Sequence, residues 1–310
     1  MSDKSNENNE KRLIYKEIET IVGTGMVLQN ELISNHNSIK IGGPADYFIT
    51  PDSQGSLKSI LKYLKLKEIP FYIMGNGSNV FAHDYGFKGA IIQIYKHMGD
   101  IMVEGKVVTA GAGVLLSKLA SKIAEAKLTG FEFAAGIPGT LGGAVFMNAG
   151  AYDGEMKDVL VEVEVIDYNG KISTIKGSDL ELGYRTSILQ TEHLIALTVK
   201  MLFNQGDEIL IRNKMKELNQ RRQDKQPLDL PSAGSAFKRP LGYYAGKLIM
   251  DAGLSGYRVG GACVSQKHCG FIVNDQNATS EDLIKLIEHI KHTVYHKFNV
   301  ILEPEIRMIS

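Results

Sequence analysis

Residues 130–152 read GFEFAAGIPGTLGGAVFMNAGAY, a stretch rich in both glycine and large apolar residues. Seven glycines fall between positions 130 and 154, yet the aromatic and aliphatic residues among them make the segment too apolar for a flexible linker. Positions 133–152 carry no charge, but five glycines and Pro138 argue against a lipid-exposed helix. Two interpretations remain: a close-packed crossing of the backbone, or an ordered loop pressed against a large flat ligand.

A second glycine-rich turn, residues 75–79 (GNGSN), directly follows a predicted buried strand at 70–74. Glycine permits positive φ and close approach, so successive N–H groups in such a turn could surround a phosphate. The alternative is a tight turn that needs glycine for its geometry alone. A third turn contains Gly111 and Gly113. The sequence has neither a GxGxxG opening a helix in a βαβ unit nor a GxxxxGK[ST]. The three segments together favour an aromatic dinucleotide held outside a Rossmann fold.

Composition excludes several classes of protein. The 310 residues contain 35 Lys+Arg and 35 Asp+Glu, and this zero net charge argues against broad nucleic-acid binding. The two cysteines, Cys263 and Cys269, and the isolated His83 and His268 have no partners at metal-ligand spacing, so we expect no metal site. No apolar signal segment begins the sequence, which favours a soluble cytoplasmic protein without membrane insertion.

Hydrophobic periodicity predicts mixed strands and helices without regular βαβα alternation, and therefore an α+β fold. We expect a disordered tail at 1–10, a helix at 11–34, and three lobes at 35–105, 106–225 and 226–310. The Asn169-Gly170 pair predicts a hairpin between strands at 159–167 and 171–175. Other expected elements are a helix capped by Ser56, a helix at 207–223, a helix capped by Thr279 or Ser280, and a strand at 300–308.

Three polar residues lie in surroundings suited to chemistry, and each also has a structural interpretation. Arg185 follows Tyr184 and Gly183, but a single arginine is more often a surface residue. Ser235 lies in a proline-bounded loop, where its hydroxyl is either a turn group or a proton donor. Glu305 follows Pro304 in an apolar segment, where the carboxylate is either a solvated edge group or an inward one that steadies enolate charge beside an arginine.

Residues 212–225 contain six basic and two acidic residues, a local charge of 6 − 2 = +4. A solvated helix face and a pocket for a multiply charged phosphate ligand both fit this charge.

The whole set of motifs resembles the UDP-N-acetylenolpyruvoylglucosamine reductase (MurB) family. The matching segments keep their order over nearly the whole chain after about residue 35. They are IGGPADYF (41–48), GNGSNVF (75–81), residues 130–152, YRTS (184–187), RRQDKQPLDLPSAGSAFKRP (221–240), AGKLIMDAGLSGYRVGGACVSQKHCGFIVN (245–274) and LEPEIR (302–307).

The resemblance implies a two-lobed FAD-binding domain of the vanillyl-alcohol-oxidase (PCMH) type and a smaller C-terminal α+β substrate domain at 226–310. It implies non-covalent FAD, NADPH as co-substrate and a sugar-nucleotide substrate, with no oligomer required. The implied NADPH-dependent reaction transfers a hydride from flavin N5 to C3 of the enolpyruvyl ether; Ser235 protonates C2, and Arg185 and Glu305 stabilise the enolate. FAD would lie along Gly75, Asn76, Gly77, Ser78 and Asn79, and along Gly136, Ile137, Pro138, Gly139, Thr140, Gly142, Gly143 and Ala144.

The expected substrate contacts are Tyr184, Arg222, Lys225, Lys238 and Arg239. Arg239 stands where many members of the family have Asn before the proline. The short stretch between Ser187 and Arg221 leaves no room for the substrate-covering loop and tyrosine of the longer family type. The chain thus resembles the shorter type II form, with Arg222 and Lys225 as candidates to cover the diphosphate. Another flavin oxidase or dehydrogenase of the same fold and a non-catalytic flavin module are the alternative functions.

Overall fold

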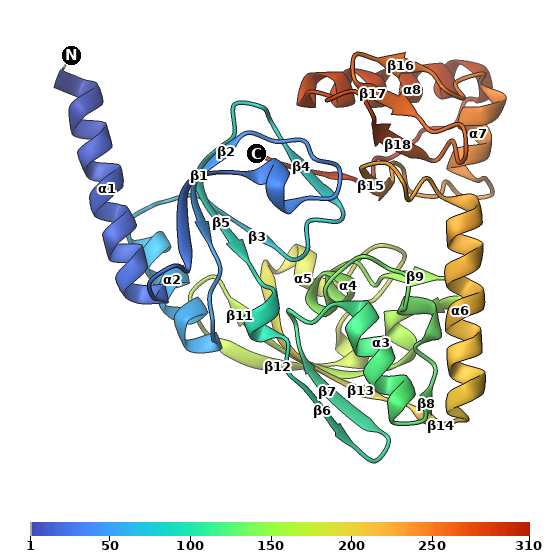
Figure 1. Cartoon of the computed structure of the whole chain (residues 1–310), viewed down its shortest axis with the longest axis horizontal. Helices are drawn as coiled ribbons and strands as arrows, with labels where there is room; N and C mark the ends of the chain where they lie inside the picture. Colours follow the sequence, from blue (N-terminus) through green and yellow to red (C-terminus); the bar gives the residue numbers. More distant parts are fainter. Residues whose placement is uncertain (1) are drawn as a thin grey trace. The chain divides into compact units, whose positions relative to one another are not determined.

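The computed structural model describes residues 2–310, with side chains from residue 9 onward (Figure 1). The chain divides into two compact units built from separated stretches of sequence. Unit 1 comprises Met1–Asn30, Asp46–Asn76 and Lys88–Gln220, and unit 2 comprises Glu31–Ala45, Gly77–Phe87 and Arg221–Ser310. This division differs from the three consecutive lobes expected from the sequence. Segments 31–45 and 77–87 join the C-terminal part because Ile39, Ile41 and Phe81 belong to the buried core of unit 2.

The N-terminal helix α1 (Ser2–Val22) is followed by strand β1 (Val27–Leu32). Residues 2–10 are therefore helical rather than the disordered tail we expected, whereas Met1 lies outside the described residues. The helix expected at 11–34 ends at Val22, because Gly23 (φ +98°) and Gly25 (φ +81°) take backbone angles outside the helical range.

A four-stranded sheet has the order β1-β2-β5-β3, with β2 at Pro44–Ile49, β5 at Phe87–Gln93 and β3 at Phe71–Met74. Strands β3 and β5 are parallel. Helix α2 (Gln54–Leu66) begins after the N-cap residue Ser53, whose side chain accepts a hydrogen bond from the backbone N–H of Ser56. The Ser56 side chain accepts a second hydrogen bond from the backbone N–H of Ser53. The expected cap at Ser56 was wrong, because Ser56 is the third helical residue of this capping box.

The second sheet of unit 1 is antiparallel, with the order β12-β11-β13-β7-β6. Gly170 (φ +80°) forms the turn between β11 and β12, which confirms the predicted hairpin. Helices α4 and α5 pack against β13. The bounds are β6 Ile101–Glu104, β7 Val107–Gly111, β11 Leu160–Asp167, β12 Ile172–Lys176, β13 Leu194–Leu202, α3 Leu116–Glu125, α4 Leu141–Phe146 and α5 Ile188–Thr191, with the short pairs β8 (Leu128–Thr129) and β14 (Asn204–Gln205), and β9 (Gly150–Ala151) and β10 (Gly154–Glu155).

Unit 2 contains a sheet with the order β15-β18-β17-β16, and α8 packs against β16, β17 and α7. Thr279, one of the two caps predicted for this helix, is the N-cap of α8. The strand expected at 300–308 is shorter, because β19 begins only at Arg307 and pairs in parallel with β4. The bounds are β4 Val80–Ala82, β15 Ser232–Ser235, β16 Arg258–Val259, β17 Ala262–Val264, β18 Phe271–Asn274, β19 Arg307–Ile309, α7 Ala245–Asp251 and α8 Ser280–Phe298.

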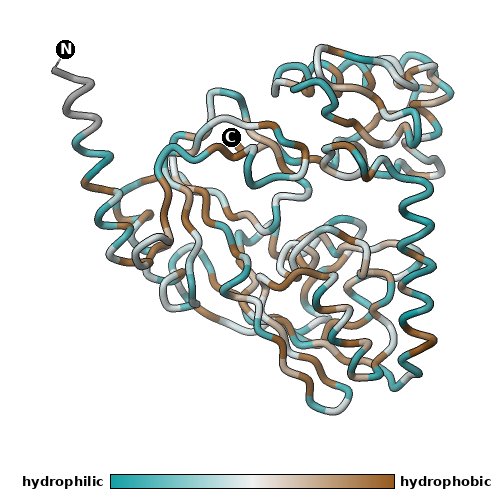
Figure 2. Tube along the Cα trace, in the orientation of Figure 1, coloured by the Kyte–Doolittle hydropathy of each residue, from teal (hydrophilic) through white to brown (hydrophobic). Residues whose placement is uncertain are grey.

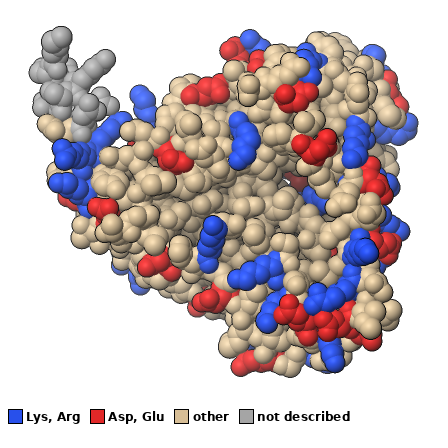
Figure 3. Space-filling view, viewed as in Figure 1, with Lys and Arg blue, Asp and Glu red and all other residues tan. Residues whose placement is uncertain are grey.

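Helix α6 (Glu208–Lys225) contains the division between the units, at Gln220 and Arg221. It is hydrophilic along most of its length (Figure 2), and its buried side chains are Ile211 and Leu218. Acidic and basic side chains are interspersed over the face shown in Figure 3, in keeping with the zero net charge.

The uncharged stretch 133–152 does not form a continuous helix. It contains most of a short 3-10 turn (Glu132–Ala134), α4 and β9. Among residues 2–310, no helix has the length and apolar character needed to cross a membrane.

Candidate active site

Two of the segments expected to hold a flavin meet inside unit 1. Thr140, the N-cap of α4, faces Gly75 so closely that a Cβ on Gly75 would lie 2.3 Å from the Thr140 Oγ1 atom. The Asn76 side chain donates to the Pro138 carbonyl oxygen at 3.0 Å. Only glycine fits at position 75, and the contact brings the turn at 75–76 against the apolar segment at 136–144.

The third glycine turn belongs to the same backbone network. Gly142 N donates to Ala112 O at 2.8 Å, and Leu116 N donates to Gly139 O at 3.0 Å. A Cβ on Gly142 would lie 2.9 Å from the Ala112 Cβ. Close backbone packing therefore explains Gly142, and it also explains Gly111 and Gly113, whose Cβ atoms would strike carbonyl oxygens of Met98 and Tyr95.

The backbone around Thr140 nonetheless remains open to a ligand. Gly136 and Gly139 are partly exposed and Gly143 is exposed, although Leu141 and Ala144 beside them are buried. An apolar segment that exposes glycine backbone on one side suits a flat aromatic ligand with phosphates. These residues fit FAD.

The turn at 75–79 divides between the two units after Asn76. In unit 2, a Cβ on Gly77 (φ +68°) would lie 2.1 Å from the His36 carbonyl oxygen, so this glycine serves the packing of the turn. The Asn79 amide donates to the Glu305 carbonyl oxygen at 3.0 Å. Asn79, which we expected to contact the cofactor, therefore also positions a predicted catalytic segment.

Ser235 and Glu305 are held on adjacent segments of unit 2. Strand β15 contains a register shift between Ser232 and Ser235, with Gly234 at φ +77°, and such bulges re-aim the side chains that follow. Glu305 N donates to the Ala236 carbonyl oxygen at 2.9 Å. An antiparallel bridge joins Phe237 to Pro304. Both side chains are half-buried, which leaves them within reach of a ligand.

Arg185 lies in unit 1, in the left-handed backbone region at φ +57°. Gly183 and Thr186 bond to each other across its turn, and Gln190 Nε2 donates to the Arg185 carbonyl oxygen at 3.1 Å. The guanidinium carbon lies 5.2 Å from the centre of the Tyr184 ring. A non-glycine residue in this region costs roughly 1–2 kcal/mol, and such strain is concentrated at functional sites.

Sequence reasoning missed the side chains that hold the Arg185 turn. Asn148 is buried and donates to the Gly183 carbonyl oxygen at 3.0 Å and to Glu155 at 2.8 Å. Ser187 and Gln190 both donate to the Phe146 carbonyl oxygen, at 2.7 Å and 2.6 Å. These bonds tie the arginine to the end of α4. A buried asparagine within an apolar glycine-rich stretch was the available signal.

The predicted substrate-binding residues of unit 2 form two groups. Lys238 is ion-paired with Glu303, and the Arg239 guanidinium carbon lies 4.0 Å from the centre of the Tyr244 ring. Arg222 and Lys225 occupy the last turn of α6, where Lys267 Nζ donates to the Gln223 carbonyl oxygen at 2.6 Å.

His268 is a second residue that the sequence left without a role. Burial lowers the pKa of His268, and the charge of Lys225 lowers it further. The Gly270 N–H donates to its Nδ1 at 3.1 Å, so the neutral ring carries its proton on Nε2. At neutral pH the imidazole therefore offers an N–H donor beside Lys267, its neighbour in the sequence. Within residues 2–310, no group of three or more His, Cys, Asp or Glu side chains is placed to hold a metal ion.

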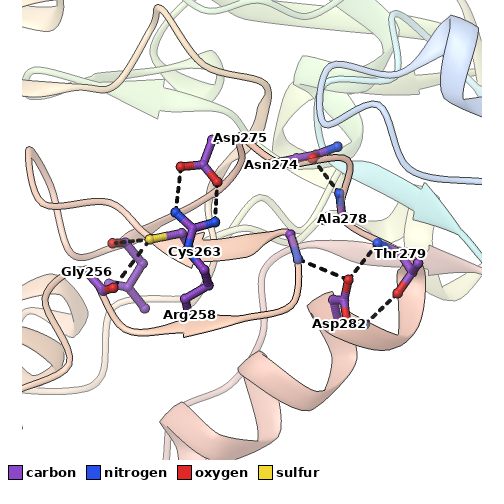
Figure 4. Close-up of polar contacts among 10 residues, drawn as sticks. Gly256, Arg258, Cys263, Asn274, Asp275, Ala278, Thr279 and Asp282 are labelled. Atoms are coloured by element: carbon purple, nitrogen blue, oxygen red, sulfur yellow. Dashed lines mark hydrogen bonds and ion pairs between the residues drawn. The ribbon is translucent and has the colours of Figure 1, made fainter.

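Charged residues away from Ser235 stabilise the sheet that contains it (Figure 4). Arg258 forms a two-bond ion pair with Asp275, at 2.6 Å and 2.8 Å. Asn274 Oδ1 accepts from Ala278 N at 2.7 Å, and Asp282 accepts from Thr279 N at 3.0 Å. These bonds connect β18 to the start of α8. Burial raises the pKa of the Cys263 thiol opposite Arg258, so Cys263 is a structural residue rather than a nucleophile.

Comparison with known proteins gives matches over both parts of the chain. Residues 45–176 match the FAD binding domain family, and residues 226–309 match the family described as UDP-N-acetylenolpyruvoylglucosamine reductase, C-terminal domain. The chain is 48% identical over 302 residues to the UDP-N-acetylenolpyruvoylglucosamine reductase of Lachnoclostridium phytofermentans, covering 96% of this chain and 97% of the relative. It is 49% identical over 301 residues to the enzyme of the same name from Alkaliphilus oremlandii, covering 97% and 99%.

A solved structure agrees with these matches. The crystal structure of UDP-N-acetylenolpyruvylglucosamine reductase (MurB) from Thermus caldophilus is similar with a TM-score of 0.78 and 33% identity, covering 91% of this chain and 98% of that one. The predicted α+β class, with a PCMH-type FAD-binding domain and a C-terminal substrate domain, is confirmed. The predicted FAD cofactor is confirmed as well.

Proposed function

Because this chain belongs to the UDP-N-acetylenolpyruvoylglucosamine reductase family, we propose that it reduces UDP-N-acetylenolpyruvoylglucosamine to UDP-N-acetylmuramate in peptidoglycan synthesis, with NADPH as the electron donor. The observation that carries the proposal is the backbone hydrogen bond from Glu305 to Ala236, which holds the Glu305 segment beside Ser235. Both residues lie in the stretch that matches the family's C-terminal domain.

FAD would be held along the turn at 75–79 and along residues 136–140 and 142–144, and when bound it supplies the hydride. The chain's own residues supply orientation, charge and a proton. Thr140 and Asn76 keep the two glycine-bearing segments together. The partly exposed backbone at Gly136 and Gly139 would offer N–H groups to phosphate oxygens. No separate nucleotide fingerprint for NADPH occurs in the sequence, which suits successive use of one site by NADPH and the sugar nucleotide.

Ser235 is the proposed proton donor to C2 of the enolpyruvyl group. The bulge at Gly234 sets the direction of its hydroxyl, and the half-buried position leaves the hydroxyl within reach of a ligand. Arg185 and Glu305 are the proposed groups that stabilise the enolate charge developing on the substrate. The backbone of Arg185 is fixed by Gln190 and by the Gly183–Thr186 bonds, and its guanidinium lies over the Tyr184 ring, which limits the positions it can take before substrate arrives.

The sugar diphosphate would be bound by Arg222 and Lys225 in the last turn of α6. Lys267 joins them in unit 2, since it bonds to the end of α6, and the neutral imidazole of His268 follows it directly in the sequence. Tyr184, Lys238 and Arg239 remain the proposed further substrate contacts. Positive groups and N–H donors together suit a diphosphate.

The flavin absorbance spectrum and the rate of NADPH oxidation test this proposal. The purified protein should show a flavin absorbance spectrum, and it should sustain NADPH oxidation over many turnovers only when the enolpyruvyl sugar nucleotide is present. NADH serves as the matched control and should be oxidised more slowly. A protein that remains colourless after incubation with FAD would contradict the proposal, as would a flavoprotein whose NADPH oxidation does not respond to that substrate.

A further inference from the structure

Helix α8 presents two exposed histidines one turn apart, His292 and His296. Their Nε2 atoms are 2.9 Å apart, with ring centroids 4.1 Å apart and ring planes inclined by 52°. Residues separated by four positions lie on the same face of a helix. Two ring nitrogens therefore already meet at the surface of unit 2, and neither histidine is among the residues proposed for the reductase reaction.

The distance between these nitrogens agrees with a particular coordination geometry. Metal–imidazole bonds are about 2.05 Å long, so two nitrogens at right angles around one metal lie about 2.9 Å apart, and two in a tetrahedron about 3.3 Å apart. The observed 2.9 Å fits the right-angled arrangement. Square-planar and tetragonal nitrogen sites are typical of Cu²⁺ and Ni²⁺.

Three neighbouring side chains contact groups other than the pair. His289, one turn earlier, stacks on Tyr257 with centroids 4.3 Å apart, so its ring is packed rather than turned toward the pair. Lys291 is paired with Glu288 at 2.8 Å, and Lys297 donates to the Ala252 carbonyl oxygen at 2.6 Å. The two nearby ammonium groups are thus directed to other acceptors.

We propose that His292 and His296 form a surface site for a divalent transition-metal ion, with water completing its coordination. Both rings bind through Nε2, and the ion takes the place of the proton that the two nitrogens otherwise share. The order of affinity is Cu²⁺ above Ni²⁺, as nitrogen ligands of this geometry favour.

The test uses the full-length, FAD-loaded protein without an affinity tag and CuCl₂ as the probe. Calorimetric titration should show one equivalent of tightly bound Cu²⁺, and its electron paramagnetic resonance spectrum should show coupling to two nitrogens. His292→Gln and His296→Gln should each weaken binding by about tenfold or more. His97→Gln, at an exposed histidine of unit 1, is the matched control and should leave the affinity unchanged.

Two outcomes would overturn the proposal. One is a spectrum without imidazole coupling, and the other is unchanged Cu²⁺ affinity in the His292→Gln/His296→Gln double variant. Flavin absorbance and circular dichroism of each variant separate loss of the site from loss of the fold. NADPH oxidation without added metal should be the same in these variants as in the parent, since the pair lies outside the proposed catalytic groups.

Discussion

The side-chain amide of Asn79 donates a 3.0 Å hydrogen bond to the backbone carbonyl oxygen of Glu305, 226 positions away in the sequence. Arg307 N donates in turn to the Asn79 carbonyl oxygen at 3.0 Å, where β19 begins beside β4. Asn79 therefore connects the glycine-rich turn expected at the flavin to the segment that contains the proposed catalytic carboxylate. A change at Asn79 should affect catalysis through Glu305.

Replacing Asn79 by Ala should lower turnover by about tenfold or more, because Glu305 loses one of the bonds that fix its backbone. The stability loss should be about 1 kcal/mol, the usual contribution of one hydrogen bond. Steady-state kinetics and FAD content per protein measure the two effects. Asn76→Ala, which removes the bond to Pro138 in unit 1, is the matched control and should lower FAD content more than it lowers turnover per bound flavin. Full turnover in Asn79→Ala would refute the positioning role.

A Gly75→Ala variant should lose most of its bound FAD. Its Cβ would lie 2.3 Å from Thr140 Oγ1, so either the turn or the start of α4 must move. Absorbance of the purified protein reports the flavin content. Gly55→Ala is the control: its Cβ meets nothing closer than 3.8 Å and it lies in helix α2, where alanine is about 1 kcal/mol more favourable than glycine. Normal flavin content in Gly75→Ala would show that the two segments do not need this contact.

An Arg185→Gly variant separates the backbone strain at this position from the catalytic role of the side chain. Glycine takes φ +57° without penalty, so the melting temperature should stay the same or rise, since roughly 1 kcal/mol of backbone strain is relieved. Because the guanidinium is proposed to stabilise the enolate, its loss should nevertheless lower kcat by about a hundredfold or more. His193→Gly, at another left-handed position (φ +50°), should gain stability and keep its activity. An Arg185→Gly enzyme with unchanged kcat would remove Arg185 from the mechanism.

The stability of unit 2 should fall in acid through two carboxylates of the sheet and α8. Hydrogen bonds from Arg258 lower the pKa of Asp275, and backbone N–H groups of Thr279 and Gly261 lower the pKa of Asp282. A folded-state pKa below the unfolded value, about 3.9, adds stability at higher pH that is lost as the pH falls through the folded value.

Urea unfolding between about pH 3 and pH 7 measures this loss as a decrease in the free energy of unfolding. The Asp275→Asn/Asp282→Asn variant should be less stable than the parent at neutral pH and lose less stability on acidification. Glu281→Gln, which breaks only an exposed pair with Lys285, should follow the parent curve. Parallel curves for the parent and the double variant would rule out this source of acid sensitivity.

Local chemistry predicted the local structure well. The Asn169-Gly170 turn, the apolar face of α2 and the Thr279 cap all depend on neighbouring residues and are present. The end of α1 was predicted too late because the apolar spacing continues past Gly23, whose positive φ stops the helix.

Contacts between segments that are far apart in the sequence could not be predicted from hydrophobic periodicity. Segments 31–45 and 77–87 pack with the C-terminal core through isolated residues such as Ile39 and Phe81. Glu305 lies beside Ala236 through one backbone bond and a bridge at Pro304, in a stretch without a continuous strand pattern. The family resemblance identified Ser235, Glu305 and Arg185 as candidate catalytic residues. Only the structure shows that Asn79 holds the Glu305 segment and that Asn148 and Gln190 hold the Arg185 turn.

The role of Ser235 as proton donor is tested by an anaerobic stopped-flow measurement on Ser235→Ala that follows flavin absorbance through each half of the reaction. NADPH should reduce the flavin of the variant at nearly the parent rate. Addition of the enolpyruvyl sugar nucleotide should then reoxidise the flavin at least about a thousandfold more slowly, because the proton donor is missing. Reoxidation at the parent rate would remove Ser235 from the mechanism.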